Sequence, residues 1–271
     1  MTAPVALDRS EVGPFAAALG RFRSARRMSQ LDLALTCQVS ARHLSFLESG
    51  RARPSREMVL LLAQGLLLPL GSRNALLQAA GFASVFPASP LNSEALGPFR
   101  AILDEMMTRH SPNPALLFDR HWTALDGNAT GHALLAGLRG ETGETNLIRM
   151  LTRNPASVAV VENLPEVIGE LSGRLQLEAL EAGDDEVLRG LLAELDEAAA
   201  RYPHRAPPGP RSPLTPVILK AADGPLTFLT TIAQFGASQD VTVRDLRLEL
   251  LFPADEPTRA AMAALAETLS G

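Results

Sequence analysis

The apolar positions in the first third of the chain recur at the spacing of short amphipathic helices. Phe15, Leu19 and Phe22 lie three or four residues apart, which places them on one helix face. Serines stand where N-caps are expected, and glycines stand where helices are expected to end. The pattern predicts five helices, over 15–27, 29–37, 40–50, 54–66 and 72–80. Five short helices in so few residues predict a compact all-α bundle.

The pattern changes after a segment rich in Pro and Ser at 84–97, which we interpret as a linker. Two short apolar runs within 115–128, separated by Asp119 and Arg120, predict a β-hairpin. Further helices are expected over 98–109, 128–138, 145–151, 164–182, 184–200 and from Asp255 or Thr258 onward; three strands are expected over 214–220, 225–236 and 243–253, after a proline-rich loop at 202–213. This mixture predicts an α+β domain with an antiparallel sheet.

The last of these strands alternates in a way that separates its two faces. Period-two alternation places successive side chains on opposite sides of a sheet. One face would carry Leu246, Leu248, Leu250 and Phe252, and the other Arg247, Glu249 and Leu251.

Length and composition are typical of a soluble globular protein with about two domains. The chain has 271 residues, of which 46% are hydrophobic and 20% charged. It contains no apolar run of the roughly 18 residues needed to span a membrane, and its first residues lack the pattern of a signal peptide. The single cysteine, Cys37, excludes an intrachain disulfide and a multi-cysteine metal site. We expect a cytoplasmic protein with no metal, no cofactor and no membrane partner.

Charge is distributed unevenly along the chain. Residues 1–83 contain ten Arg and five Asp or Glu, a net charge of +5, although the whole chain carries −5. Residues 84–271 therefore carry −10. A basic region joined to an acidic one is typical of a protein that contacts nucleic acid at one end, although chance asymmetry produces the same pattern.

The segment from Ser29 to Ser55 has the spacing of a helix-turn-helix. Leu33 and Ala34 would pack against the second helix, and Val39 would fill the turn. The N-terminal half of the second helix would then enter the major groove of DNA. The expected DNA contacts are Gln30, Ser40, Ala41, Arg42, His43, Ser45, Phe46, Ser49, Arg51 and Arg53.

Several of these contacts have distinct expected roles. Arg42 is the long cationic donor of the half-helix, and arginine fits the O6/N7 edge of guanine. Gln30 stands at a helix N-terminus, where it can meet a phosphate, and Arg51 and Arg53 would reach the DNA backbone. The alternative is an ordinary helical bundle, or a helix-turn-helix used for protein contacts.

The sequence SQLDLALTCQVSARHLSFLESGRARPS resembles the XRE-type, phage-repressor-like helix-turn-helix. The Ser-Gln start, the Leu-Ala pair, the Val-Ser turn and the Glu-Ser-Gly-Arg ending agree with that pattern, and the likeness covers about residues 15–81. Cys37 and Gln38 depart from it, because the family usually has a small residue and Gly there. The resemblance implies a domain over 1–83 that binds a double-stranded DNA operator.

The rest of the chain resembles the MmyB-like ligand-binding domain found behind such helix-turn-helix segments. The likeness rests on NPALLFDRHWTALDGNATGHALL, NLIRMLTRNP and the ending TFLTTIAQFGASQDVTVRDLRLELLFPADEPTRAAM, over about residues 98–269. It implies a PAS-like domain over 98–271 with an internal pocket for a fatty-acid-like or other apolar ligand. We expect a homodimeric transcriptional regulator whose two recognition helices read a near-palindromic operator.

A ligand pocket needs an apolar lining and a few convergent polar groups. The candidates are Phe118, Trp122, Leu134, Leu138, Leu147, Met150, Phe228 and Phe235 for the lining, and His121, Arg149, Arg153 and Gln234 for a polar head. Each has a plainer interpretation, since Trp122 and the aliphatic residues suit a packed core and the polar ones suit a solvated surface.

No pattern typical of a catalytic site is present. The five His residues form neither HExxH nor HxH spacing, and the chain lacks a phosphate-binding Gly loop and GxSxG. Cys37 falls on the buried side of the helix-turn-helix, which favours packing over nucleophilic use. We expect no enzyme activity. The remaining alternative is a protein-interaction module with a purely structural or dimerising second domain.

Overall fold

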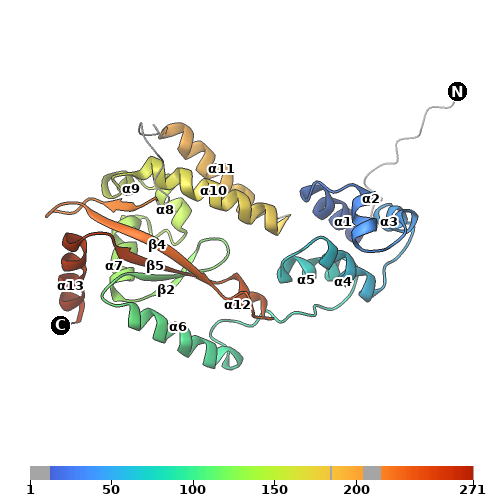
Figure 1. The fold of residues 1–271 in the computed structure, drawn as a ribbon, viewed down its shortest axis with the longest axis horizontal. Helices are drawn as coiled ribbons and strands as arrows, with labels where there is room; N and C mark the ends of the chain where they lie inside the picture. Colours follow the sequence, from blue (N-terminus) through green and yellow to red (C-terminus); the bar gives the residue numbers. More distant parts are fainter. Residues whose placement is uncertain (1–12, 184, 204–214, 271) are drawn as a thin grey trace. The chain divides into compact units, whose positions relative to one another are not determined.

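The computed structural model describes residues 13–183, 185–203 and 215–270. The chain divides into two compact units (Figure 1). The first runs to Pro87 and also includes Glu178–Asp185, and the second comprises Ala88–Leu177 and the chain from Glu186 onward. Each unit has its own hydrophobic core.

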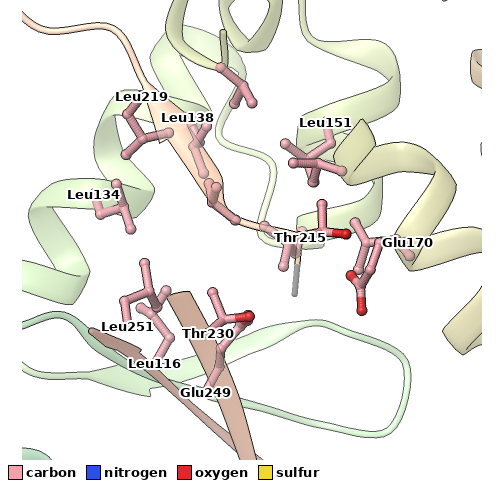
Figure 2. A pocket seen from close by; sticks show the side chains of 15 residues that line it. Leu116, Leu134, Leu138, Leu151, Glu170, Thr215, Leu219, Thr230, Glu249 and Leu251 are labelled. Carbon is pink, nitrogen blue, oxygen red and sulfur yellow. The ribbon is translucent and has the colours of Figure 1, made fainter. Parts of the chain in front are cut away.

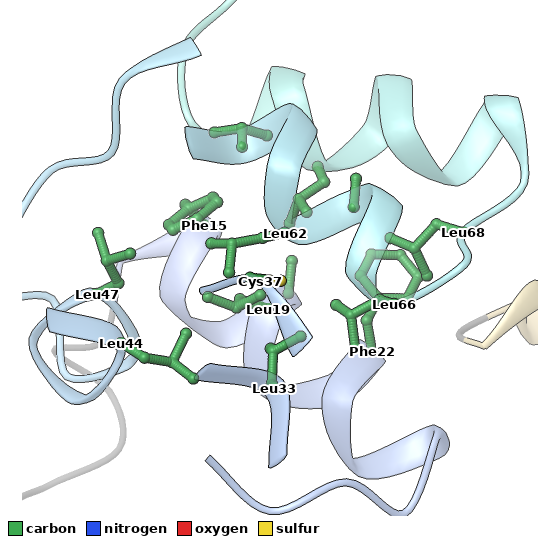
Figure 3. Close-up of a cluster of buried hydrophobic side chains, with 14 of the residues drawn as sticks. Phe15, Leu19, Phe22, Leu33, Cys37, Leu44, Leu47, Leu62, Leu66 and Leu68 are labelled. Carbon is green, nitrogen blue, oxygen red and sulfur yellow. The ribbon is translucent and has the colours of Figure 1, made fainter. Parts of the chain in front are cut away.

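The first unit contains the five predicted helices. They are α1 Pro14–Ala25, α2 Gln30–Thr36, α3 Ala41–Glu48, α4 Arg56–Gly65 and α5 Leu70–Ala79. Phe15, Leu19 and Phe22 of α1 meet leucines of the other helices in one buried cluster (Figure 3). The apolar face of α1 that the residue spacing predicts is therefore the face that packs into this core.

Three serines begin the helices that follow α1, as the sequence predicts. Ser29 accepts a hydrogen bond from the Asp32 amide at 3.1 Å while Asp32 accepts one from the Ser29 amide at 2.8 Å, which is a complete capping box. Ser40 caps α3 and Ser55 caps α4 in the simpler form, each accepting from the amide three residues on. These bonds satisfy amide donors that the first turn of a helix leaves without partners.

The second unit is α+β, which confirms the predicted fold class. Its helices are α6 Gly97–His110, α7 Ala129–Arg139, α8 Leu147–Arg153, α9 Pro155–Val160, α10 Leu164–Ala182, α11 Glu186–Arg201, α12 Val241–Asp245 and α13 Glu256–Ser270, with short 3₁₀ turns at Glu94–Leu96 and Gly140–Thr142. The end of α10, from Glu178, belongs to the first unit. Its strands are β1 Ala115–Phe118, β2 Ala124–Gly127, β3 Val217–Leu219, β4 Leu226–Gln234 and β5 Arg247–Pro253.

The five strands form one antiparallel sheet in the order β2-β1-β5-β4-β3. The early hairpin therefore pairs with the late strands through β1 and β5, where Leu116 lies opposite Glu249. In Figure 1, α6 runs along one side of the sheet, and α10 and α11 lie on the opposite side. The sheet is thus covered on both faces.

The two faces of β5 divide as the alternation predicts. Leu246, Leu248 and Leu250 pack with Leu103 and Met107 of α6 in one apolar cluster. Glu249 and Leu251 face the opposite side and line a cavity there. A charged residue of this strand therefore points into the molecule.

One local prediction is wrong, one helix was not predicted, and one predicted loop lies mostly outside the described residues. Val243–Asp245, predicted as strand, belongs to the short helix α12, because buried Asp240 accepts hydrogen bonds from the amides of Thr242 and Val243 and starts a helical turn. Helix α9 was not predicted, since Pro155 at its first turn reads equally well as a break. Most of the proline-rich loop at 202–213 falls outside the described residues.

Candidate functional site

The first turn of α3 presents its side chains to solvent. Ser40, Ala41 and Arg42 are exposed, and His43 and Ser45 are partly buried. The Ser40 hydroxyl accepts a hydrogen bond from the His43 amide at 3.1 Å, which fixes the start of the helix. The arrangement combines a capped helix N-terminus with an exposed cation two residues into the helix, a combination that suits an anionic partner.

Phe46 contacts two guanidinium groups. The guanidinium carbon of Arg42 is 5.3 Å from the centre of the Phe46 ring, and that of Arg51 is 5.9 Å away. Such cation–π contacts contribute about 0.5–1 kcal/mol each at exposed sites. They restrain both cations against α3 while their N–H edges stay accessible. Ser49 and Arg53 are also exposed nearby in sequence.

Glu48, the last residue of α3, ties three helices together. Its carboxylate accepts two hydrogen bonds from the Arg23 guanidinium of α1, at 2.6 and 2.8 Å. It also accepts one from the Gln30 amide of α2, at 2.9 Å. The Arg23 and Glu48 side chains retain only 17% and 8% of their surface, so the pair is largely enclosed. Gln30 is therefore held by a neighbour in the first unit, and its phosphate contact stays a prediction.

The two residues that depart from the helix-turn-helix pattern, Cys37 and Gln38, lie in the turn between α2 and α3. Gln38 has φ of +54°, in the left-handed region where Gly is favoured. The buried Cys37 thiol occupies space that Gly65 of α4 leaves open, because a Cβ at Gly65 would lie 2.3 Å from the sulfur. Burial raises the pKa of this thiol, which suits its packing role.

The second unit contains a partly open apolar cavity of about 70 Å³ between the sheet and the helices that cover it (Figure 2). Leucines form most of its wall: Leu116, Leu134, Leu138, Leu147, Leu151, Leu171, Leu219 and Leu251, with Val161, Val167 and Val217. Its polar lining consists of Glu170 of α10, Thr230 of β4, Glu249 of β5 and Thr215. Figure 2 shows Thr230 and Glu249 side by side, with the Glu170 carboxylate turned toward the same space.

Glu249 is the most perturbed acid of this cavity. Enclosure by protein is the main reason that its pKa rises to about 7; Arg174 lowers the pKa, Glu170 raises it and a hydrogen bond with Thr230 lowers it. The side chain retains some accessible surface because it faces the cavity itself. Glu170 is paired with the Arg174 guanidinium one turn further along α10. The polar end of the cavity is therefore acidic.

Only part of the expected ligand-contacting set lies around this cavity. Leu134, Leu138 and Leu147 are in its wall. The large side chains of the set are elsewhere: Phe118, Trp122, Met150 and Phe228 are buried in the core, and Phe235 packs edge-on against Phe99 at 4.8 Å on the α6 side of the sheet. For these residues the plainer interpretation as core describes the structure better.

The expected polar contacts also lie away from the cavity. Arg149 and Arg153 both pair with Glu194 of α11, at 3.4 and 2.7 Å, beside a separate shallow depression. Gln234 is exposed at the end of β4. His121 lies in the turn after β1, where its amide donates to Asp119 at 2.8 Å. The sequence did not point to Glu170, Thr230 or Glu249, and the one usable signal was a glutamate on the Leu251 face of an apolar strand.

Comparison with protein families agrees with this division of the chain. Residues 14–76 match the model of a helix-turn-helix domain. Residues 99–265 match the model of the MmyB-like transcription regulator ligand binding domain. The fold and these matches define a DNA-binding regulator that carries a ligand-binding domain. The second match spans more than half of the chain, and the chain belongs to the MmyB-like transcription regulator family.

No curated protein matches the chain significantly. Both matched families are regulatory rather than enzymatic. Within the described residues, no helix is both long and apolar enough to pass through a bilayer. The same residues contain no cluster of three or more His, Cys, Asp or Glu suited to a metal ion.

Proposed function

We propose that α3 reads a specific operator sequence in the major groove and that a small, largely apolar molecule in the cavity changes operator affinity. The observation that carries the DNA contact is the capped, exposed first turn of α3, with Arg42 and Arg51 both in contact with the Phe46 ring. Such a function requires access to the chromosome, so we infer a cytoplasmic location.

The proposal includes a homodimer. Two copies of α3 about one duplex turn apart would read a near-palindromic operator, with Ser40, Ala41 and Phe46 adding short-range base contacts and Arg53 a backbone contact. Selection of bound duplexes from a random pool would supply both the operator and its half-site spacing. A single, unrepeated half-site would exclude the dimer while leaving the DNA contact intact.

Replacing Arg42 with Ala is the direct test of base readout. Loss of one good arginine–guanine contact is expected to weaken specific binding by about 1–3 kcal/mol. The variant should stay folded, because Arg42 is exposed and its contact with Phe46 contributes only about 0.5–1 kcal/mol. Anisotropy titration against the selected operator measures this. Arg42→Lys keeps the charge but cannot donate two parallel hydrogen bonds to one base. It should therefore bind nonspecific DNA as the unaltered chain does, and bind the operator as weakly as Arg42→Ala does.

The matched control removes an exposed arginine from the second unit. Arg259→Ala on α13 changes the net charge equally and should leave operator affinity unaltered. Unchanged operator affinity for Arg42→Ala would remove this residue from the readout. If the intact chain ignores duplex DNA at low salt, or binds it without loss of affinity as salt rises, the helix-turn-helix is a protein-contact module instead.

The cavity half of the proposal rests on its apolar wall and on the family match. At about 70 Å³ the cavity is smaller than the roughly 300 Å³ usual for pockets that enclose a ligand. A ligand must therefore be small or must displace leucine side chains as it enters. A thermal-shift screen with small apolar compounds should identify some that raise the melting temperature. Uniform absence of stabilisation would leave this domain as a structural or dimerising unit.

A further inference from the structure

The cavity has an acidic end and an apolar remainder, which restricts the head group that it can accept. Among the described residues that line it, the charged ones are Glu170 and Glu249, and both are acidic. Thr215 and Thr230 are the other polar residues of the lining. A ligand that places its polar group anywhere in this lining therefore meets carboxyl and hydroxyl groups.

The nearest cation is already engaged. The Arg174 guanidinium pairs with Glu170 and also lies over the Trp122 ring, 5.6 Å from its centre. Arg247, two residues from Glu249 on the same face of β5, lies over the same ring at 5.9 Å. Two contacts hold Arg174 in place, and it is not part of the cavity wall. An incoming carboxylate would have to displace Glu170 to reach it.

A carboxylate head and an ammonium head therefore face opposite electrostatics in this cavity. A carboxylate would lose its water beside Glu170 and, above about pH 7, beside an ionised Glu249. A charge removed from water without a partner is costly. An ammonium group has three donors and no acceptor. Glu249, Glu170 and the Thr230 hydroxyl offer acceptors that converge on one end of the cavity (Figure 2).

We propose that the ligand of this cavity is a small apolar amine, with its hydrocarbon part against the leucines and its protonated nitrogen between Glu249 and Glu170. This proposal rests on the proposed function, because it assumes that the cavity is the ligand site, and it replaces the carboxylate head of a fatty-acid-like ligand by a cationic one.

The titration of Glu249 gives the two head groups opposite pH dependences. Its pKa of about 7 means that the side chain is mostly protonated below that value and mostly ionised above it. The charged neighbours are Glu170 and Arg174 of α10, while the other elements of the wall contribute leucines, valines and threonines. An alkylamine stays protonated throughout this range, as lysine does with a pKa of about 10.4. Amine binding should therefore strengthen as pH rises, whereas a carboxylate could bind only as Glu249 gains its proton.

The test compares three ligands that share one hydrocarbon chain: hexylamine, hexanol and hexanoate. Calorimetric titration of the intact chain at about pH 6 and about pH 8 brackets the Glu249 pKa of about 7. Hexylamine is expected to bind about tenfold or more tightly than hexanoate at the higher pH, and more tightly there than at the lower pH. Hexanoate binding as well as hexylamine, or better at both values, overturns the amine proposal while the cavity stays a ligand site.

Variants locate the effect at the cavity. Glu249→Gln should weaken hexylamine binding about tenfold and abolish the pH dependence of that binding. The affinity for hexanol should be unchanged. The variant should also melt at a higher temperature at about pH 8, because it removes an enclosed charge, so misfolding would be visible. Glu267→Gln, exposed on α13, makes the same charge change and should leave all three affinities unaltered.

The remaining outcomes decide between the two proposals. Undiminished hexylamine binding in Glu249→Gln would place the amine elsewhere and overturn this inference. If none of the three compounds binds the intact chain, the amine proposal falls together with the ligand-site half of the proposed function, and the DNA-binding half is unaffected.

Discussion

One residue of the turn between α2 and α3, Gln38, has a backbone conformation that residues other than Gly disfavour. Gln38 is exposed and left-handed, with φ of +54°. The left-handed region costs a non-Gly residue about 1–2 kcal/mol of strain. Gly avoids this strain but loses more chain entropy on folding, so the net gain in stability is smaller than the strain itself. We expect Gln38→Gly to raise the free energy of unfolding by about 0.5–1 kcal/mol in urea titration. Gln38→Ala, which keeps a Cβ, should give no gain, and an equal gain from both would assign the effect to the lost side chain.

The contact between Cys37 and Gly65 gives a second prediction at this scale. A Cβ added at Gly65 would lie 2.3 Å from the Cys37 sulfur, so Gly65→Ala should destabilise the first unit by about 1–3 kcal/mol. Removing the sulfur with Cys37→Ala makes room for that methyl group. The double variant should therefore lose less stability than the two single variants together. Simple additivity in thermal unfolding would contradict a direct clash.

Sequence reasoning succeeds at residues whose signal is local. The caps at Ser29, Ser40 and Ser55 were predictable because each bond joins residues three apart. The role of Glu249 was not predictable from the sequence. A charged side chain on a strand points to solvent or into a cavity depending on which helix covers that face of the sheet, and the local sequence does not specify that helix. Glu170, which shares the cavity with Glu249, lies far away in the sequence.

At the scale of elements, Glu48 connects α1, α2 and α3 through Arg23 and Gln30. Glu48→Gln removes the charge from a largely enclosed pair and leaves the Arg23 guanidinium without its carboxylate. We expect a loss of about 2 kcal/mol in the free energy of unfolding, since charge-assisted forked bonds are among the stronger ones. Glu57→Gln, an exposed change of equal charge on α4, should cost much less. Equal losses would show that the three-helix junction adds nothing specific.

The same scale separates elements that were predictable from those that were not. Helices α10 and α11 follow long amphipathic patterns and were predicted within about two residues at each end. The second half of α12, from Val243, was predicted as strand because Val243 favours strands, and Asp240 overrides that preference from a buried position. The pairing of β1 with β5 joins segments more than a hundred residues apart, and no local pattern specifies such a neighbour.

For the whole molecule, the effect of ligand on operator affinity must equal the effect of operator on ligand affinity, because both describe one coupling free energy. If hexylamine changes operator affinity by some factor, saturating operator must change hexylamine affinity by the same factor and in the same direction. We expect a factor of about 5–150 for a ligand that acts as an effector. This coupling factor can be measured in two independent ways: by titrating hexylamine with and without operator, and by titrating operator with and without hexylamine. Glu249→Gln should lose the coupling at moderate hexylamine concentration and keep its affinity for operator alone. Hexylamine binding with no coupling in either direction would mean that the cavity is occupied without controlling the DNA-binding unit.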